Sequence, residues 1–190
     1  MPLPQATDRE PLHERSISYR GYLRADGRWD INAWLRDVKA YDREVDGRLL
    51  SAGTPVHDMG LRVTLDDGLE IVAIEVAMDS APFAECRRVQ AKMQALVGAR
   101  LGRGWRDAIQ ARIGGIEGCT HLRELLFGVA TAAIQTIPPV LARRRAASGI
   151  EVPGDSRAPA HLNTCLGWDA TGPAVLRYYP KHARTAGPGS

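Results

Sequence analysis

The amino-acid sequence predicts an α+β fold, in which an antiparallel sheet of about four to five strands is covered by C-terminal helices. Two Asp-Gly pairs predict the sheet. Asp26-Gly27 and Asp67-Gly68 each separate two runs rich in aromatic and β-branched residues, which is typical of β-hairpins. Helical spacing of apolar residues begins only after Pro82. Strands first and helices second argue against an alternating α/β chain.

Two successive hairpins make up the predicted sheet. The first joins Ile17–Leu23 to Trp29–Leu35, and its second strand is expected to run on toward Asp46-Gly47. The second joins Leu61–Leu65 to Ile71–Met78, where apolar and polar residues alternate. One face of such a sheet needs cover.

Three helices are expected to supply that cover. The first covers Pro82–Val97 and ends at Gly98, and a short second helix follows Gly104. The third covers Cys119–Ile137 and is expected to end or kink at Pro138-Pro139. The residues that keep to one face of this last helix are Leu122, Leu126, Val129, Ala133 and Ile137.

The domain organisation follows from composition. The chain has 190 residues, of which 44% are hydrophobic, and this suits one domain with a sizeable core. Residues 1–14 are predicted to be a flexible lead, residues 15–148 a single α+β domain, and residues 149–190 a linker and tail. In the tail, the apolar run over residues 174–179 is predicted to be an edge strand.

Composition also limits the function. The 25 Lys and Arg residues barely exceed the 22 Asp and Glu residues, and the arginines are scattered, so we expect no nucleic-acid partner. We find no apolar run near the roughly 20 residues of a membrane span and no signal-peptide pattern, so we expect no membrane association. Three scattered cysteines predict reduced thiols and a cytoplasmic protein. The standard nucleotide-binding motifs are absent.

The most distinctive stretch is GGIEGCTHLRELL, residues 114–126. Three glycines deliver Cys119 and His121 to the start of the third helix, and glycines so closely spaced suggest a close approach of the backbone. A helix N-terminus favours a thiolate. The pair is therefore a candidate for catalysis or metal binding, although Cys119 as a small buried hydrophobe stays open as an alternative.

Two further residues are predicted to join this pair. His57 begins one strand of the second hairpin and Asp79 ends the other, so the hairpin brings both to one end of the sheet. With a metal, His57, Cys119 and His121 would be ligands for zinc or iron, and Asp79 or Asp58 a ligand or base. Without a metal, a histidine would be the general base and Cys119 a thiolate.

These residues favour a small enzyme with lyase or hydrolase chemistry on a small-molecule substrate. The catalytic set would be His57, Asp79, Cys119 and His121. The alternative is a non-enzymatic metal-binding or scaffold-like protein that docks on a partner. Formation of a homo-oligomer is left open by the sequence.

Several segments resemble a bacterial family of unknown function, DUF2889. They are REPLHER, RGYLRADGRWDI, PVHDMGLRVTLDD, GGIEGCTHLRELL and AAIQTI, and the resemblance covers roughly Pro11 to Tyr179. It implies no activity. The family pattern has a histidine directly after the cysteine that matches Cys165, whereas this sequence has Leu166 there.

A more distant similarity in pattern links Asp58–Ile137 to iron–sulfur scaffold proteins of the IscU type. It implies an IscU-like core, with His57 in place of the acidic ligand and Cys119 in place of the last ligand cysteine. Ala81 falls near the middle cysteine and the first cysteine has no counterpart. Because a cluster needs several thiolates, this similarity implies the location of a site but not cluster assembly.

Overall fold

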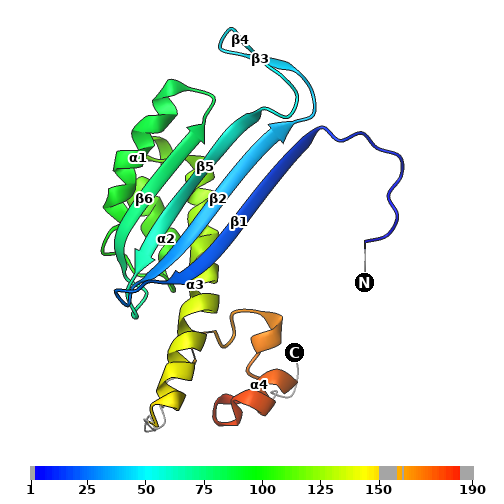
Figure 1. Ribbon diagram of the computed structural model, residues 1–190. Helices are drawn as coiled ribbons and strands as arrows, with labels where there is room; N and C mark the ends of the chain where they lie inside the picture. The colour runs from blue at the N-terminus through cyan, green and yellow to red at the C-terminus, as the bar shows by residue number, and fades with distance from the viewer. Residues whose placement is uncertain (1–2, 150–157, 160, 185–190) are drawn as a thin grey trace. The chain divides into compact units, whose positions relative to one another are not determined.

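The computed structural model describes residues 3–149, 158–159 and 161–184. The chain divides into two compact units, Met1–Arg144 and Arg145–Ser190. The first contains a four-stranded antiparallel sheet in the order β1-β2-β5-β6. Its strands are β1 (His13–Leu23), β2 (Trp29–Lys39), β5 (Pro55–Leu65) and β6 (Ile71–Ser80). Figure 1 shows this sheet with helices on one face, which confirms the predicted α+β class.

The two hairpin turns differ in detail from one another. At the first, Gly27 has a φ of +83° and the Arg24 amide donates to the Arg28 carbonyl over 2.8 Å. At the second, the left-handed residue is Leu69 rather than Gly68. The carboxylate of Asp66 stabilises that turn by accepting the amides of Gly68 and Glu70, each over 2.8 Å.

A small hairpin that was not predicted from the sequence connects β2 to β5. It consists of β3 (Arg43–Val45) and β4 (Arg48–Leu50), joined by Asp46-Gly47. Both turn residues have positive φ, 51° and 70°, as a two-residue hairpin turn of this hand requires. The predicted end of the second strand at this Asp-Gly pair is therefore the turn of a separate two-stranded sheet.

The helical layer begins in short pieces. Where one helix was expected over Pro82–Val97, the chain forms η1 (Ala84–Arg88), α1 (Val89–Lys92) and η2 (Met93–Leu96). The short helix after Gly104 is α2 (Trp105–Ile113), and η3 (Gly115–Glu117) follows it. Met93, Leu96, Ile109 and Ile113 are completely buried, so these pieces cover the sheet as expected.

The long helix α3 (Thr120–Ala147) completes the layer and continues through Pro138 and Pro139, where an end or a kink was predicted. Its predicted core face is confirmed, because Leu122, Leu126, Val129, Ala133 and Ile137 are all completely buried. Two glycines bring α3 close to β1. Tyr19 lies against Gly128 of the helix and Thr136 lies against Gly21 of the strand, where any side chain in place of either glycine would collide.

By length and composition alone, α3 is apolar enough to cross a membrane. The expectation from the sequence that no segment is long and apolar enough to cross a membrane is therefore corrected. A core helix of a soluble protein passes the same test, and the buried face of α3 belongs to the main hydrophobic core. One such helix is weak evidence for a membrane span.

Beyond the end of α3, the described residues of the second unit form only short helices: η4 (Leu166–Trp168), α4 (Pro173–Tyr178) and η5 (Pro180–His182). The prediction of an edge strand over residues 174–179 is therefore wrong, because most of this run forms the helix α4. Gly172 precedes the helix and Pro173 occupies its first turn, where a proline's fixed φ favours a helix start. Most of the predicted linker, residues 150–157 and 160, and the last six residues lie outside the described part.

Candidate functional site

Neighbouring strands bring three polar side chains into one row. In the strand register, Arg15 of β1 pairs with Asp37 of β2, and Asp37 pairs with His57 of β5. His13 lies two residues before Arg15 and therefore on the same face of β1. β1 begins at His13, so the strand starts within the segment 1–14 that was predicted to be a flexible lead. His13 and Arg15, on either side of the predicted boundary, both contact Asp37.

Asp37 is the centre of the cluster, and its side chain is only 3% exposed. Oδ1 accepts Arg15 Nε at 2.8 Å and lies 3.1 Å from His13 Nε2. Oδ2 accepts Arg15 Nη2 at 2.8 Å and lies 2.9 Å from His57 Nδ1. Burial raises the pKa of this carboxyl, but the hydrogen bonds and charge of Arg15, with the two histidine contacts, outweigh burial and lower the pKa to about 2.

The contact with Asp37 orients His57. An ionised carboxylate only accepts hydrogen bonds, so His57 Nδ1 carries the proton and Nε2 presents its lone pair. The His57 side chain is 15% exposed. Burial lowers its pKa, Asp37 opposes this, and the charges of Arg15 and Arg43 lower it further. The net shift is downward, which favours a neutral imidazole able to accept a proton.

His121 and Cys119 extend the cluster from the start of α3. The imidazole rings of His57 and His121 lie with their centroids 3.8 Å apart and tilted by 34°. Cys119 Sγ lies 3.7 Å from His121 Nδ1. Burial lowers the pKa of His121, and the neighbouring His57 and Arg15 lower it further. The cluster therefore runs from Arg15 through Asp37 and His57 to His121 and Cys119.

The glycines before Cys119 allow this approach. A side chain at Gly118 would collide with the carbonyl of Ile113, and one at Gly114 with the carbonyl of Gln110. Gly115 has a φ of +55°, which favours glycine. The close backbone approach predicted for this stretch is present, and it positions Cys119 immediately before the first turn of α3.

Two predicted carboxylates lie elsewhere. Asp79 is exposed near the end of β6, and among the described residues its carboxylate has no hydrogen bond or ion pair. Asp58 accepts Trp34 Nε1 at 2.5 Å and lies 3.5 Å from Arg36 Nε. The structure thus brings His57, Cys119 and His121 together but leaves out Asp79 and Asp58, and Asp37 supplies the carboxylate instead.

A metal ion at this site would meet an occupied carboxylate. One ligand atom from each of Asp37, His57 and His121 lies within 4.8 Å of the other two, a spacing that a single ion could bridge after small movements. However, each carboxylate oxygen of Asp37 already contacts two nitrogen atoms. A carboxylate has about four acceptor positions, so none is left free for a metal ion. The positive charge of Arg15 also opposes a cation beside Asp37.

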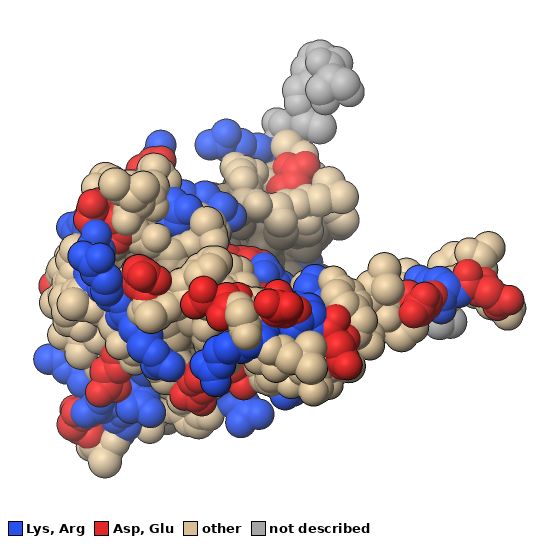
Figure 2. Space-filling view, turned by 90° about the horizontal axis from the view of Figure 1, so that it is seen from above, with Lys and Arg blue, Asp and Glu red and all other residues tan. Residues whose placement is uncertain are grey.

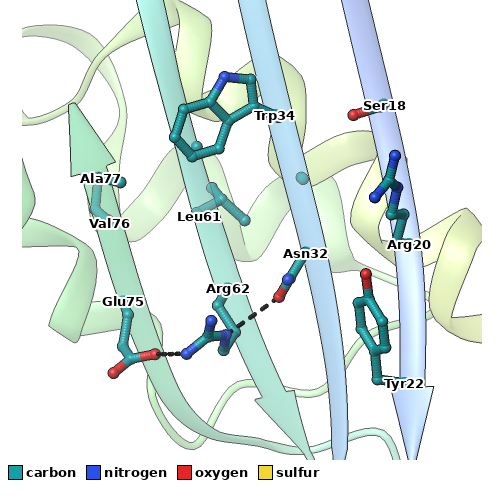
Figure 3. Close-up of a pocket in the computed structure, with 12 residues that line it drawn as sticks. Ser18, Arg20, Tyr22, Asn32, Trp34, Leu61, Arg62, Glu75, Val76 and Ala77 are labelled. Carbon is teal, nitrogen blue, oxygen red and sulfur yellow. Dashed lines mark hydrogen bonds and ion pairs between the residues drawn. The ribbon is translucent and has the colours of Figure 1, made fainter. Parts of the chain in front are cut away.

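A cavity that the structure describes is a different site, on the outer face of the sheet. It has a volume of about 570 Å³. Figure 3 shows Arg62 between Glu75 and Asn32. Arg62 Nη1 donates to Glu75 at 2.9 Å and Arg62 Nε to Asn32 at 3.2 Å. The ring of Trp34 occupies the place that a side chain at Gly60 would need. No member of the histidine cluster lines it. On the face seen in Figure 2, acidic and basic side chains are interspersed.

Comparison with known proteins identifies a family and no activity. A family model described as a protein of unknown function, DUF2889, matches residues 13–135, which is well over half of the chain. No curated protein and no solved structure matches. The similarity to IscU-type proteins is therefore not shown by these comparisons.

Proposed function

We propose that this chain, which belongs to the DUF2889 family, is an enzyme that moves protons on a small metabolite, in lyase or hydrolase chemistry. The observation that supports this most is the half-buried His57, whose Nδ1 is held by the carboxylate of Asp37. A base held in one orientation by a second group is the usual arrangement for proton abstraction.

In this proposal His57 is the general base, acting through Nε2. When it takes a proton, the imidazolium forms beside Asp37, and the negative charge of that carboxylate stabilises it. Arg15 lowers the pKa of Asp37, so this carboxyl is ionised near neutral pH. Asp37 and Arg15 are thus positioning residues, while His57 is the residue that meets the substrate.

His121 and Cys119 are assigned the second half of the chemistry. Two imidazolium ions would repel each other strongly at a centroid separation of 3.8 Å, so at most one of the two rings carries the additional proton of an imidazolium at a time. One ring then acts as a base while the other acts as an acid. In a hydrolase, His121 would accept the proton of Cys119 and leave a thiolate nucleophile; in a lyase, it would protonate the leaving group.

The second candidate is a metal-dependent site with zinc or iron held by His57, His121 and Cys119. The proximity of Cys119 Sγ to His121 Nδ1, 3.7 Å, and of the two imidazole rings favours it, and the Asp37–His57 contact resembles the outer carboxylate that orients metal-bound histidines. The positive charge of Arg15, which contacts Asp37, weighs against it. A non-enzymatic scaffold that docks on a partner has less support, because His57 and Asp37 are mostly buried, with side chains 15% and 3% exposed.

We also propose that the enzyme works in the cytoplasm. Cys86, Cys119 and Cys165 are all free, and a reducing compartment keeps the thiol beside His121 available.

The experiment that tests the proposed function works with a mixture of candidate substrates. Purified protein is incubated with a metabolite extract in water enriched in deuterium and oxygen-18, and mass spectrometry identifies labelled compounds. Deuterium at carbon indicates proton abstraction, and oxygen-18 indicates hydrolysis. We expect His57→Gln to abolish the labelling and Asp79→Asn, an exposed control, to preserve it. Equal labelling with wild type and His57→Gln would exclude the assigned base.

A further inference from the structure

Within the part of the chain that the structure describes, Arg43, at the start of β3, forms no ion pair. Nη1 and Nη2 of its guanidinium are buried from solvent and have no hydrogen-bond partner among the described residues. A guanidinium carries a positive charge, and in this half-buried residue two of its three nitrogens are left without a hydrogen-bonding partner. A buried polar group without a partner is costly, and it calls for an explanation, of which a ligand that completes it is one.

The position of Arg43 places this charge at the histidine cluster. The β3–β4 hairpin is the connection between β2, which carries Asp37, and β5, which carries His57. It is held at the end of the sheet because the Gly53 amide donates to the Lys39 carbonyl and the Ala52 amide to Asp42 Oδ1, each over 2.8 Å. The charge of Arg43 also acts on His57, whose pKa it helps to lower.

The other strong cation of the cluster is already neutralised. Arg15 contacts Asp37 through two nitrogens and Glu124 through a third, at 2.6 Å. Arg43 therefore adds one unpaired unit of positive charge beside a neutral base. The two terminal nitrogens of a guanidinium form a fork that matches the two oxygens of a carboxylate.

We infer that Arg43 binds a carboxylate of the substrate and holds the adjoining carbon chain against His57. The substrate class is a small carboxylic acid. A single carboxylate carries one negative charge and balances Arg43, whereas a phosphate monoester carries about −1.5 to −2 near neutral pH and would need a second cation. This inference rests on the proposed function for the reaction, but the binding of the anion stands independently.

The test uses sodium butyrate as the probe, with inorganic phosphate as the competing anion and constant ionic strength. Binding is followed by the NMR signals of the histidine rings. We expect saturable binding of butyrate to wild type and to Arg48→Gln, a control that removes the same charge from the exposed facing strand. Arg43→Gln should weaken binding by at least about tenfold. Arg43→Lys, which keeps the charge but loses the fork, should fall between them.

Three outcomes would overturn the inference: no saturable butyrate binding to wild type, equal weakening in both Gln variants, or tighter binding of phosphate than of butyrate. Arg43→Gln should melt no lower than wild type without ligand, because it removes an unpaired charge. His57→Gln distinguishes this inference from the proposed function. Butyrate should still bind to that variant, so anion binding can be correct even if His57 is not the base. Conversely, if the labelling experiment succeeds but wild type does not bind butyrate, only the role of Arg43 is excluded.

Discussion

Replacing Asp37 with Asn should make the protein less stable at neutral pH and remove part of its acid sensitivity. The pKa of Asp37 is about 2, against an ordinary value of 3.8. The difference of about 1.8 units, at 1.36 kcal/mol per unit, corresponds to about 2–3 kcal/mol of stability from the ionised form. Because the pKa is lowered on folding, this contribution is complete above about pH 5 and is lost as the pH falls from about 4 to 2.

The assay is urea unfolding followed by circular dichroism between pH 7 and pH 3. We expect Asp37→Asn to be about 2–3 kcal/mol less stable than wild type at pH 5, and this gap to shrink as the carboxyl of the wild type is protonated. Asp79→Asn makes the same change of charge at an exposed carboxylate and should stay within about 0.5 kcal/mol of wild type. If the free energy of unfolding changes equally for wild type and Asp37→Asn between pH 5 and pH 3, the assigned ion pair is refuted.

Three further predictions concern the core, the histidines and the metal. Leu126→Ala should cost about 2–5 kcal/mol in urea unfolding, because Leu126 is completely buried, whereas Ile134→Ala, at 38% exposure on the same helix, should cost under about 1 kcal/mol; equal costs would contradict the assigned helix face. NMR titration should give His57 a pKa below 6.5, and Asp37→Asn should lower that pKa further, because Asp37 raises it; an increase would refute the contact. Elemental analysis of untagged protein should find well below one zinc or iron per chain, and stoichiometric metal lost in Cys119→Ser would favour the metal-dependent candidate instead.

The sequence predicted the sheet and the buried face of α3 because both depend on local periodicity. Alternation over Leu61–Leu65 and the spacing of Leu122 and Leu126 repeat on scales that a short window captures. The run at residues 174–179 was misread for the same reason. An apolar stretch of six residues fits a strand or a helix, and Pro173 before it was the signal for a helix start.

The candidate site was predicted only in part, because it depends on which strands are neighbours. His57, Cys119 and His121 stood out as chemistry-bearing residues near a turn or a glycine cluster. Asp37 had a signal that was overlooked: it follows Trp29, Ile31, Ala33 and Leu35 at every second position, so the strand register buries it with them. The partnership of Asp37 with Arg15 follows from the pairing of β1 with β2, which places residues 22 apart in the chain side by side. Arg43 lies in a strand of three residues, too short to show a period.

The contact between Tyr19 and Gly128 has a consequence for the order in which the molecule assembles. The ion pair between Arg15 and Glu124 joins residues 109 apart in the sequence, so the site closes only when the first strand meets the last helix of its unit. Closing so long a loop has an entropic cost that local hairpins avoid. The two glycine contacts let strand and helix approach closely enough for packing to offset that cost. During synthesis, the contacts of β1 with α3 cannot form until α3 has emerged, so the cluster that runs from Arg15 to Cys119 is among the last parts of the molecule to form.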